Sequence, residues 1–459
     1  MTAAQQTKPT DAPNDNAPIK LEQDQFFDPW RAPRTPKART LVADVTRQVE
    51  SYERHRRPRD RQRKQKDQAV FEATIAAIVC NLAHAHLSDH KEGLAVSRSN
   101  RELGVKSRYR SPVLGKKFPE ALDLMASPEM SFVKQRLGYR NPLANRNQQT
   151  LINVGPRLKN MIVERDLELS DIGWSMDEET IILKATKEDF WDPGAWIEYE
   201  DTAETNAMRS QLKQINAWLD EADIFIIDDR NLTISGLDER ERRLRRVFTQ
   251  GSFERGGRLF GGRWQPMGKH ERLRKLEIGG EKVVELDYSQ MAPRLLYGMV
   301  SEKPPASDAY LVPGPADPTQ FRDGFKKLFN ALLFTEKPLE RKPQGTESLL
   351  PKENIKVLVQ RLRDFHQPVA HFFETGIGHH LQFRESQLML EVLLRLRDQD
   401  IIALPVHDAV IIPASAEQST RRVMGEVFLE KVGIEAVITR TPSLDPTQGN
   451  VLPLLYRDS

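Results

Sequence analysis

The spacing of apolar residues divides the chain into predicted helices and strands. Apolar residues recur at helical spacing over 69–87, 203–222 and 381–396, which predicts helices that each bury one face. Short β-branched runs at 150–154 and within 224–234 predict strands. Helical and strand signals are mixed along the rest of the chain, so we expect a protein of the α+β class.

Two further apolar runs each place a carboxylate at the end of a strand. The run 283–287 ends on Asp287, and two runs within 401–413 meet at His407 and Asp408, as in a β-hairpin. Aspartate is common where strands end, so either residue alone could be an ordinary turn residue. Two such aspartates together supply the oxygen ligands for a pair of divalent cations. Because they are far apart in the sequence, only the fold can bring them together.

The segment 322–334, which lies between these aspartates, predicts a basic helix. Arg322 and Lys326 are one helical turn apart, so both lie on one face and could reach the phosphates of a nucleotide. The alternative is a basic amphipathic helix on the protein surface.

A glycine- and arginine-rich stretch precedes the first aspartate. Its paired glycines would let the backbone approach a ligand closely, and Arg258, Arg263 and Trp264 offer phosphate contacts and a stacking face. The alternative is a glycine-rich hairpin within the sheet. A second basic run, at 54–66, could follow a phosphate backbone or form a solvated helix face.

Composition narrows the class of protein without identifying a partner. The chain has 459 residues, enough for two or three domains, and its 68 lysines and arginines nearly balance 66 acids. Net charge therefore gives little evidence for nucleic acid. The single cysteine, Cys80, excludes an internal disulfide and suits a reducing compartment. No apolar run approaches the roughly 18 residues of a membrane span, so we expect a cytoplasmic protein with no membrane partner.

Three motifs together resemble a known enzyme family. Asp-Tyr-Ser-Gln at 287–290, followed by Arg294, resembles motif A of the family A DNA polymerases, and Val-His-Asp at 406–408 resembles their motif C, which single-subunit RNA polymerases share. The segment 322–334 has its arginine and lysine at the spacing of motif B. The three motifs occur in the family's order, and the resemblance covers roughly residues 240–435.

The resemblance implies a polymerase palm, which is an antiparallel sheet backed by helices, with helical fingers and a mainly helical N-terminal region. The accessory domain that precedes it could be winged-helix-like, gripping duplex DNA with a helix and a basic wing, or an ordinary α+β domain. The resulting order is a disordered tail at 1–40, a basic helical segment at 41–90, the accessory domain at 91–200, a thumb-like helical region leading into the palm at 201–300, fingers at 301–380 and palm completion at 381–459.

The resemblance also implies roles for individual residues. It places two Mg²⁺ ions, with Mn²⁺ as an alternative, on Asp287, Asp408 and the carbonyl of Tyr288. The residues implied for catalysis are Asp287, Asp408, Lys326 and Arg322. The residues implied for nucleotide binding are Tyr288, Gln290, Ala292, Arg322, Lys326, Asn330 and Phe334. The residues implied for nucleic-acid binding are Arg258, Arg263, Trp264, Arg294, Gln387 and His407.

Three of these positions depart from the family pattern. DNA polymerases of the family have a glutamate that blocks a ribose 2′-hydroxyl at the position of Ala292, so we expect tolerance of ribonucleotides. Asn330 replaces an aromatic residue. Phe334 replaces a tyrosine, which preserves stacking but removes a hydroxyl hydrogen bond.

The first interpretation is therefore a DNA-directed DNA polymerase, a two-metal nucleotidyltransferase with no proofreading exonuclease. Its expected partners are a DNA template-primer and nucleoside triphosphates, together with replication or mobile-element proteins. One alternative is an RNA polymerase or primase of the single-subunit type. Another is a non-catalytic, DNA-binding replication-accessory protein with a degenerate palm. The sequence leaves the oligomeric state open.

Overall fold

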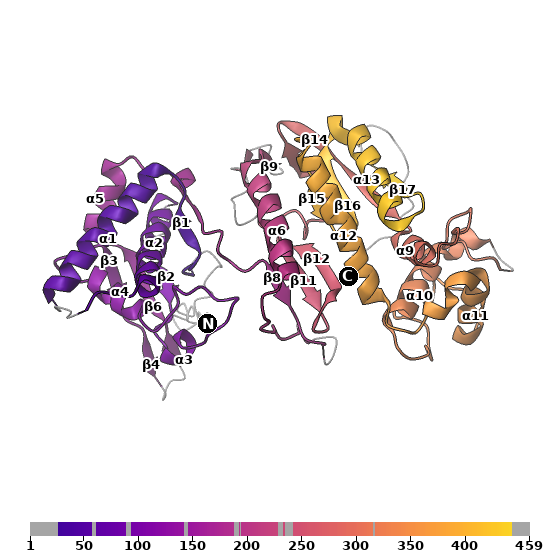
Figure 1. Ribbon diagram of the computed structural model, residues 1–459, viewed down its shortest axis with the longest axis horizontal. Coiled ribbons are helices and arrows are strands. Elements are labelled where there is room, and N and C mark those ends of the chain that lie inside the picture. The colour runs from indigo at the N-terminus through magenta and orange to yellow at the C-terminus, as the bar shows by residue number, and fades with distance from the viewer. Residues whose placement is uncertain are drawn as a thin grey trace, which may run out of the picture. The chain divides into compact units, whose positions relative to one another are not determined.

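The chain forms two compact units, whose boundary in the sequence lies between Glu178 and Glu179. Each unit mixes helices and strands and has a hydrophobic core of its own, so the chain is of the expected α+β class (Figure 1). The computed structural model describes residues 26–56, 61–88, 93–141, 146–187, 192, 194–227, 233–234, 242–314 and 317–442.

The first unit contains a pair of long helices, a three-stranded sheet and a two-stranded hairpin. Its elements are β1 (Arg31–Pro33), α1 (Pro36–Arg56), α2 (Gln65–Leu87), β2 (Leu94–Val96), α3 (Asn100–Leu103), α4 (Phe118–Met125), β3 (Val133–Arg136), β4 (Tyr139–Asn141), β5 (Arg146–Gln148), β6 (Thr150–Val154), α5 (Pro156–Glu164) and β7 (Ile172–Trp174).

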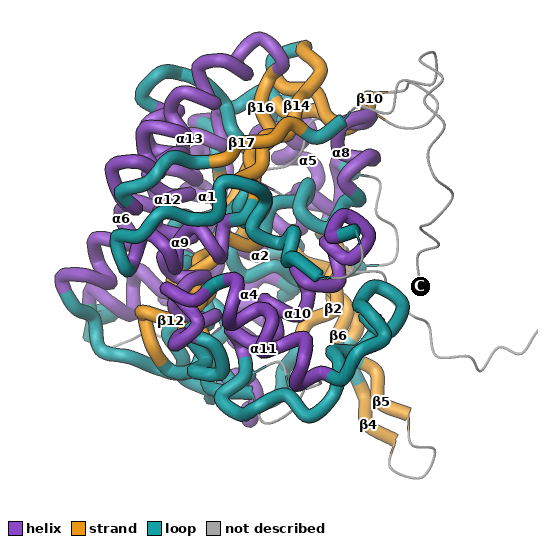
Figure 2. The backbone as a smooth tube through the Cα atoms, turned by 90° about the vertical axis from the view of Figure 1, so that its right-hand side faces the viewer, coloured by secondary structure: helices purple, strands orange, loops and turns teal. Residues whose placement is uncertain are grey.

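The three-stranded sheet has the order β2-β6-β3, and both pairings are antiparallel. Between β3 and β6 the chain forms the antiparallel hairpin β4–β5, which extends beyond the sheet (Figure 2). The helix α2 packs against β6, α4 and α5 and supplies much of the core, including the buried Cys80. The first unit is therefore built around α2, and the sheet and the short helices pack on this helix to form one hydrophobic core.

The start of this unit is ordered farther toward the N-terminus than we expected. The proposed tail was to run to residue 40, but β1 pairs with β7 and α1 begins at Pro36. The reason is that Asp28 is buried and its carboxylate accepts a hydrogen bond from the indole of Trp174. The expectation is therefore wrong for 26–40, and 1–25 lie outside the described residues.

One helix among the described residues, α2, is long and apolar enough to cross a membrane by length and composition alone. Half of its most apolar window is buried inside the first unit. Packing in the core accounts for that composition.

The second unit contains the stretches with the candidate site residues. Its elements are β8 (Ile181–Leu183), α6 (Ala203–Glu221), β9 (Ile224–Ile227), β10 (Thr233–Ile234), β11 (Arg245–Thr249), β12 (Ser252–Phe260), α8 (Lys269–Lys275), β13 (Leu276–Ile278), β14 (Glu281–Ser289), α9 (Met291–Met299), α10 (Arg322–Phe334), α11 (Ile355–Phe365), α12 (Gly378–Arg397), β15 (Leu404–Val406), β16 (Ala409–Pro413), α13 (Glu417–Val432) and β17 (Val437–Arg440).

The longest sheet of this unit is built around β14. Its order is β10-β9-β13-β14-β16-β15, and β17 also pairs with β14. All of these pairings are antiparallel. The helix α13 packs against β14, β16 and β17, and α12 packs against α13 (Figure 1). A second sheet has the order β12-β11-β8, and α12 packs against its strand β12.

Most of the helices and strands expected here are present at the expected places. The helices α6, α10 and α12 and the hairpin β15–β16 follow the predicted stretches closely. The thumb-like helical region at 201–300 is a correction, because its described residues after α6 contain the six strands β9 to β14 with only the short helices α8 and α9. Their β-branched and aromatic residues pair across strands instead of lining a helix.

Candidate functional site

Asp287 lies near the end of β14, and Asp408 lies in the turn just before the neighbouring strand β16. Asp287 is opposite Ala409 in the antiparallel pair β14–β16, and the N–H of Tyr288 donates a hydrogen bond to the carbonyl of Asp408 at 3.1 Å. His407 and Asp408 form the two-residue turn between β15 and β16, with His407 in the left-handed region at φ 56°. The fold therefore joins the two acids that the sequence separates.

The electrostatics of Asp287 reflect this closeness. Burial, followed by the negative charge of Asp408, raises the pKa of Asp287 well above its ordinary value. The ammonium groups of Lys269 and Lys326 act in the opposite direction. Two carboxylates and two lysines thus share one partly buried site, in which added positive charge would relieve the repulsion between the acids.

A third carboxylate, Glu285, lies two residues before Asp287 on β14. Its side chain is 3% exposed and accepts two hydrogen bonds from Arg272 of α8, at 3.0 and 2.8 Å. Lys269 of the same helix places its ammonium 3.6 Å from the other carboxylate oxygen. Because Glu285 is already paired, it acts mainly to hold α8, and with it Lys269, beside Asp287.

A fourth acid approaches the pair from α12. Glu385 is 5% exposed and forms a two-pronged ion pair with Arg258 of β12, with both N–O distances 2.7 Å. Burial, together with the charges of Asp408 and Asp287, raises the pKa of Glu385 to about 7, and the ion pair with Arg258 opposes this rise. Arg258 is therefore occupied by a carboxylate beside the site.

The two cations of α10 have different surroundings. Lys326 is exposed and close enough to Asp287 for its charge to act on that acid. Arg322 instead binds Asp308 through two guanidinium nitrogens, at 3.0 and 2.7 Å. The helix thus brings Lys326 to the acids, while Arg322 is held by the loop that precedes it.

The residues after Asp287 are divided between the core and the start of α9. Tyr288 is buried, and its hydroxyl donates to the carbonyl of Met424 in α13, so its ring cannot contact a nucleotide. The side chain of Gln290 accepts a hydrogen bond from the N–H of Ala309, and Arg294 donates to the carbonyl of Glu435. For the side chain of Tyr288 the expected nucleotide contact is therefore wrong, because alternate residues of a strand face opposite sides of the sheet.

Ala292 lies in the first turn of α9 and is half-buried. Its small side chain leaves this turn, which directly follows the Asp287 strand, without a bulky group. Residue 292 therefore places only a methyl group at the start of α9.

The expected stacking face of Trp264 is a second correction. The indole is fully buried, and its Nε1 donates to the carbonyl of Pro405 in β15 at 2.9 Å. No base can stack on a ring with no exposed surface. The neighbouring Arg263 is exposed. Trp264 instead ties the end of β12 to the hairpin that carries Asp408.

The hairpin tip itself is more open. His407 is exposed, and its ring meets Phe260 edge to face with ring centroids 5.7 Å apart. Partial removal from solvent, together with the Arg258 cation, lowers the pKa of His407, and the Asp408 charge opposes this effect. His407 is thus mostly neutral near pH 7 and can exchange hydrogen bonds with a bound ligand.

Three further expected contact residues lie on α10 and α12. Phe334, at the end of α10, packs edge to face on His379, and Asn330 is half-buried on the same helix. Gln387 follows Glu385 by two residues and so points about 200° around α12. It lines a hollow of about 340 Å³ between helices α6, α9, α12 and α13. The residues that line this hollow include neither of the two aspartates.

The donor set fits hard divalent cations. Carboxylate oxygens are the ligands that Mg²⁺ prefers, and because burial and the charge of Asp408 raise the pKa of Asp287, a bound cation would favour the ionised form of this acid. Within the described ranges no group of three or more histidine, cysteine, aspartate or glutamate side chains is arranged to hold a metal ion. Asp287 and Asp408 are therefore the candidate ligands among the described residues, and substrate oxygens would have to supply the others.

Comparison with known proteins adds no family to this description. No protein-family model matches the chain, and no curated protein sequence matches it.

Proposed function

We propose that the chain is a template-directed nucleotidyltransferase of the family A DNA polymerase type, without a proofreading exonuclease, which extends a primer on DNA. The observation that carries the proposal is the convergence of Asp287, on β14, and Asp408, in the turn that leads into the neighbouring strand β16, with Lys326 beside them. A chance pair of strand-end acids would not be expected to meet beside a basic helix that the sequence also singles out.

The second unit supplies parts that suit this function. The strands β14, β16 and β15, backed by α12 and α13, would form the palm, and α9 to α11 the fingers. The antiparallel order and the packing of α13 against β14, β16 and β17 support this assignment. The face of β14 that carries Asp287 would then receive the primer end and the nucleotide.

Each charged group has a role in this scheme. Asp287 and Asp408 would hold two Mg²⁺ ions, or Mn²⁺ in their place, with the carbonyl of Tyr288 as a further ligand. When bound there, the ions activate the primer 3′-hydroxyl and neutralise the pyrophosphate leaving group. Lys326 of α10 and Lys269 of α8 would bind the triphosphate, because the positive charges of both are close enough to lower the pKa of Asp287.

Two arginines would have to exchange partners when substrate binds. Arg322 can reach a triphosphate only by leaving Asp308, and Arg258 can reach a primer only by leaving Glu385. A phosphate offers a guanidinium the same two-pronged geometry as a carboxylate, so each exchange replaces one charge-assisted pair by another.

The proposal is tested by primer extension with purified Asp287→Asn and Asp408→Asn proteins. Each change keeps the shape of the side chain but removes the negative charge that a metal ligand needs, so extension should fall by at least about a hundredfold. Asp364→Asn, an exposed position on α11, is the matched control and should retain wild-type extension.

The outcome also separates the classes of function. Wild-type extension by Asp287→Asn would refute the metal assignment. A wild-type protein that binds duplex but extends neither DNA nor RNA primers with Mg²⁺ or Mn²⁺ would support the accessory-protein alternative.

Ala292 leads to a prediction about sugar selection. Because no glutamate stands at this position, the ratio of dNTP to rNTP incorporation should be low, and Ala292→Glu should raise it by about tenfold or more. Single-nucleotide incorporation on one template measures both ratios. Ala292→Ser, which adds little volume, should leave the ratio low. A wild-type ratio in the thousands would contradict this inference.

A further inference from the structure

The first unit concentrates positive charge in one stretch of a nearly neutral chain. Residues 97–149 contain eleven lysines and arginines and four acids, a net charge of +7, whereas the whole chain carries +2. This stretch includes α3, α4, β3 and the β4–β5 hairpin. The charge is therefore grouped on the part of the unit that surrounds the three-stranded sheet.

The order of elements around that sheet is the order of a winged helix-turn-helix. A long helix, α2, precedes β2, two short helices follow, and β3 and β6 then close the antiparallel sheet in the order β2-β6-β3. The hairpin β4–β5 prolongs β3 and β6 in the place of the wing (Figures 1 and 2). A two-stranded ribbon of this kind has the width to enter a groove of B-form DNA.

The basic residues at the base of this hairpin are directed outward. Lys134 and Arg136 alternate along β3 with Gln135, and both are exposed, while Gln135 is half-buried and faces α4. Among the described residues, neither cation has a side-chain ion pair or hydrogen bond. They are thus available to phosphate groups.

The acidic side chain that lies beside β3, Asp123, is already paired. The carboxylate of Asp123 on α4 accepts two hydrogen bonds from Arg98 and one from Gln135, and Arg98, with the hydrogen bonds, lowers the pKa of Asp123 although burial opposes this. Asp123 is therefore ionised, and its negative charge is already paired with the positive charge of Arg98. Other exposed cations lie on α3 and on the segment that leads to α4, namely Arg101, Lys106, Lys116 and Lys117.

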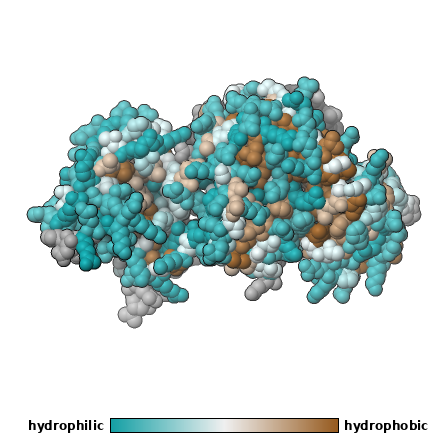
Figure 3. Space-filling view, in the orientation of Figure 1, coloured by the Kyte–Doolittle hydropathy of each residue, from teal (hydrophilic) through white to brown (hydrophobic). Residues whose placement is uncertain are grey.

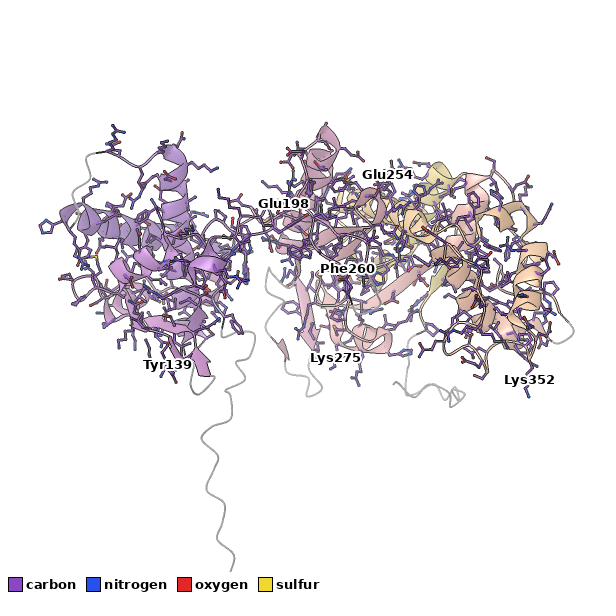
Figure 4. The ribbon with its side chains drawn as sticks, turned by 90° about the horizontal axis from the view of Figure 1, so that it is seen from below. Tyr139, Glu198, Glu254, Phe260, Lys275 and Lys352 are labelled. Atoms are coloured by element: carbon purple, nitrogen blue, oxygen red, sulfur yellow. The ribbon has the colours of Figure 1, made fainter. Side chains whose placement is uncertain are left out.

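Apolar side chains accompany the cations. Leu137 is 60% exposed and Tyr139 is 56% exposed, although most of this unit presents hydrophilic side chains on the face that Figure 3 shows. Figure 4 shows Tyr139 at the outer edge of the unit, where β4 leaves the body. Exposed apolar and aromatic side chains beside cations are the combination that proteins press into DNA grooves between phosphate contacts.

We propose that the arm formed by β3, β4, β5 and β6 is a duplex-DNA binding site, separate from the candidate polymerase site. Lys134 and Arg136 contact phosphates, and Leu137 and Tyr139 rest against the sugars and base edges of a groove. The proposal does not depend on the polymerase activity, because it uses none of the residues of the second unit.

The test is binding of the full-length chain to a fluorescent, blunt 20-base-pair DNA in metal-free buffer, measured by anisotropy at several salt concentrations. Each lost phosphate contact lowers the slope of log K against log salt by about 0.9, so Lys134→Ala with Arg136→Ala should lower it by about 2 and weaken binding about tenfold. Tyr139→Ala should weaken binding with little change in the slope.

The matched control removes two exposed lysines from other elements of the same unit. Lys37→Ala with Lys159→Ala, on α1 and α5, should leave both the affinity and the slope unchanged. Thermal unfolding of every variant shows whether the unit still folds. A second variant, Gly138→Ala, keeps all charges but puts a methyl group 2.3 Å from the Gln148 carbonyl, so it should displace the arm and also weaken binding.

The results distinguish the possible partners. Equal DNA affinity of the arm variant and the control variant would overturn the proposal. So would arm-dependent binding to duplex RNA of the same sequence, or to phosphatidylserine vesicles, without arm-dependent binding to DNA. Primer extension by Asp287→Asn is measured separately, so loss of either site is seen independently of the other.

Discussion

At the scale of single residues, the site is an arrangement of acids whose charges are not fully compensated. The sequence indicated Asp287 and Asp408, because each follows an apolar strand. It did not indicate Lys269 or Glu385, which lie in no motif and come to the site only through the packing of α8 and α12. Trp264 shows the opposite error, because the sequence indicated a site residue that is in fact buried in the core. An aromatic residue beside arginines looks the same in a sequence whether it is buried or exposed.

Magnesium should stabilise the protein in a pH-dependent way. The pKa of Asp287 is higher in the folded state than in the unfolded state. Protonated Asp287 therefore adds its full contribution to the free energy of unfolding below its ordinary pKa near 4, and this contribution is lost as pH rises through the folded-state pKa. A cation needs the ionised acid, so the gain in Tm on adding Mg²⁺ should be small at pH 5.5 and grow toward pH 8. At saturation we expect a gain of roughly 5 °C, measured by differential scanning fluorimetry.

Variants of the pair provide the control for this measurement. Asp408→Asn removes the repulsion, so it should raise Tm in EDTA and abolish the gain from Mg²⁺. Asp364→Asn should behave as wild type in both buffers. A gain from Mg²⁺ that is independent of pH, or that survives in Asp408→Asn, would place the ion elsewhere.

At the scale of elements, the position of Asp408 depends on how β12 is joined to the β15–β16 hairpin. The carbonyl of Pro405 accepts hydrogen bonds from both Trp264 and Gln265, which lie in the turn after β12. The hairpin could be predicted from its two apolar runs, as could α10 and α12 from their spacing. The contact between hairpin and turn could not, because no local pattern records which carbonyl a distant indole will reach.

The glycine beside this indole should therefore be sensitive to substitution. A Cβ on Gly262 would lie 2.4 Å from the Trp264 ring, so Gly262→Ala must displace the ring and the hairpin. We expect a loss of about 1–3 kcal/mol in the free energy of unfolding, measured with urea, and a fall in primer extension. Gly268→Ala in the same linker meets no atom within 4 Å and should be neutral. Equal stability of the two variants would show that the ring is free to move.

At the scale of the whole molecule, the two units have separate hydrophobic cores. One core contains buried residues between 38 and 172, and the other contains buried residues from 181 onward. Apolar periodicity predicted α2 in the first core and α6 and α12 in the second. The sequence also predicted strands within 224–234 and at 283–287, but not the order in which they pair, since strand pairing depends on residues far away in the chain.

Separate cores should give separate unfolding transitions. In differential scanning calorimetry of the full chain, Leu82→Ala should lower one transition and Leu393→Ala the other, each by about 5 °C or more, because a buried leucine contributes about 2–5 kcal/mol to its own core. Mg²⁺ should raise only the transition that Leu393→Ala lowers, since both aspartates belong to that unit. Duplex DNA without Mg²⁺ should raise the transition that Leu82→Ala lowers. If either ligand instead raised both transitions equally, the two units would unfold as one, and the two proposed sites could not be assigned to separate bodies.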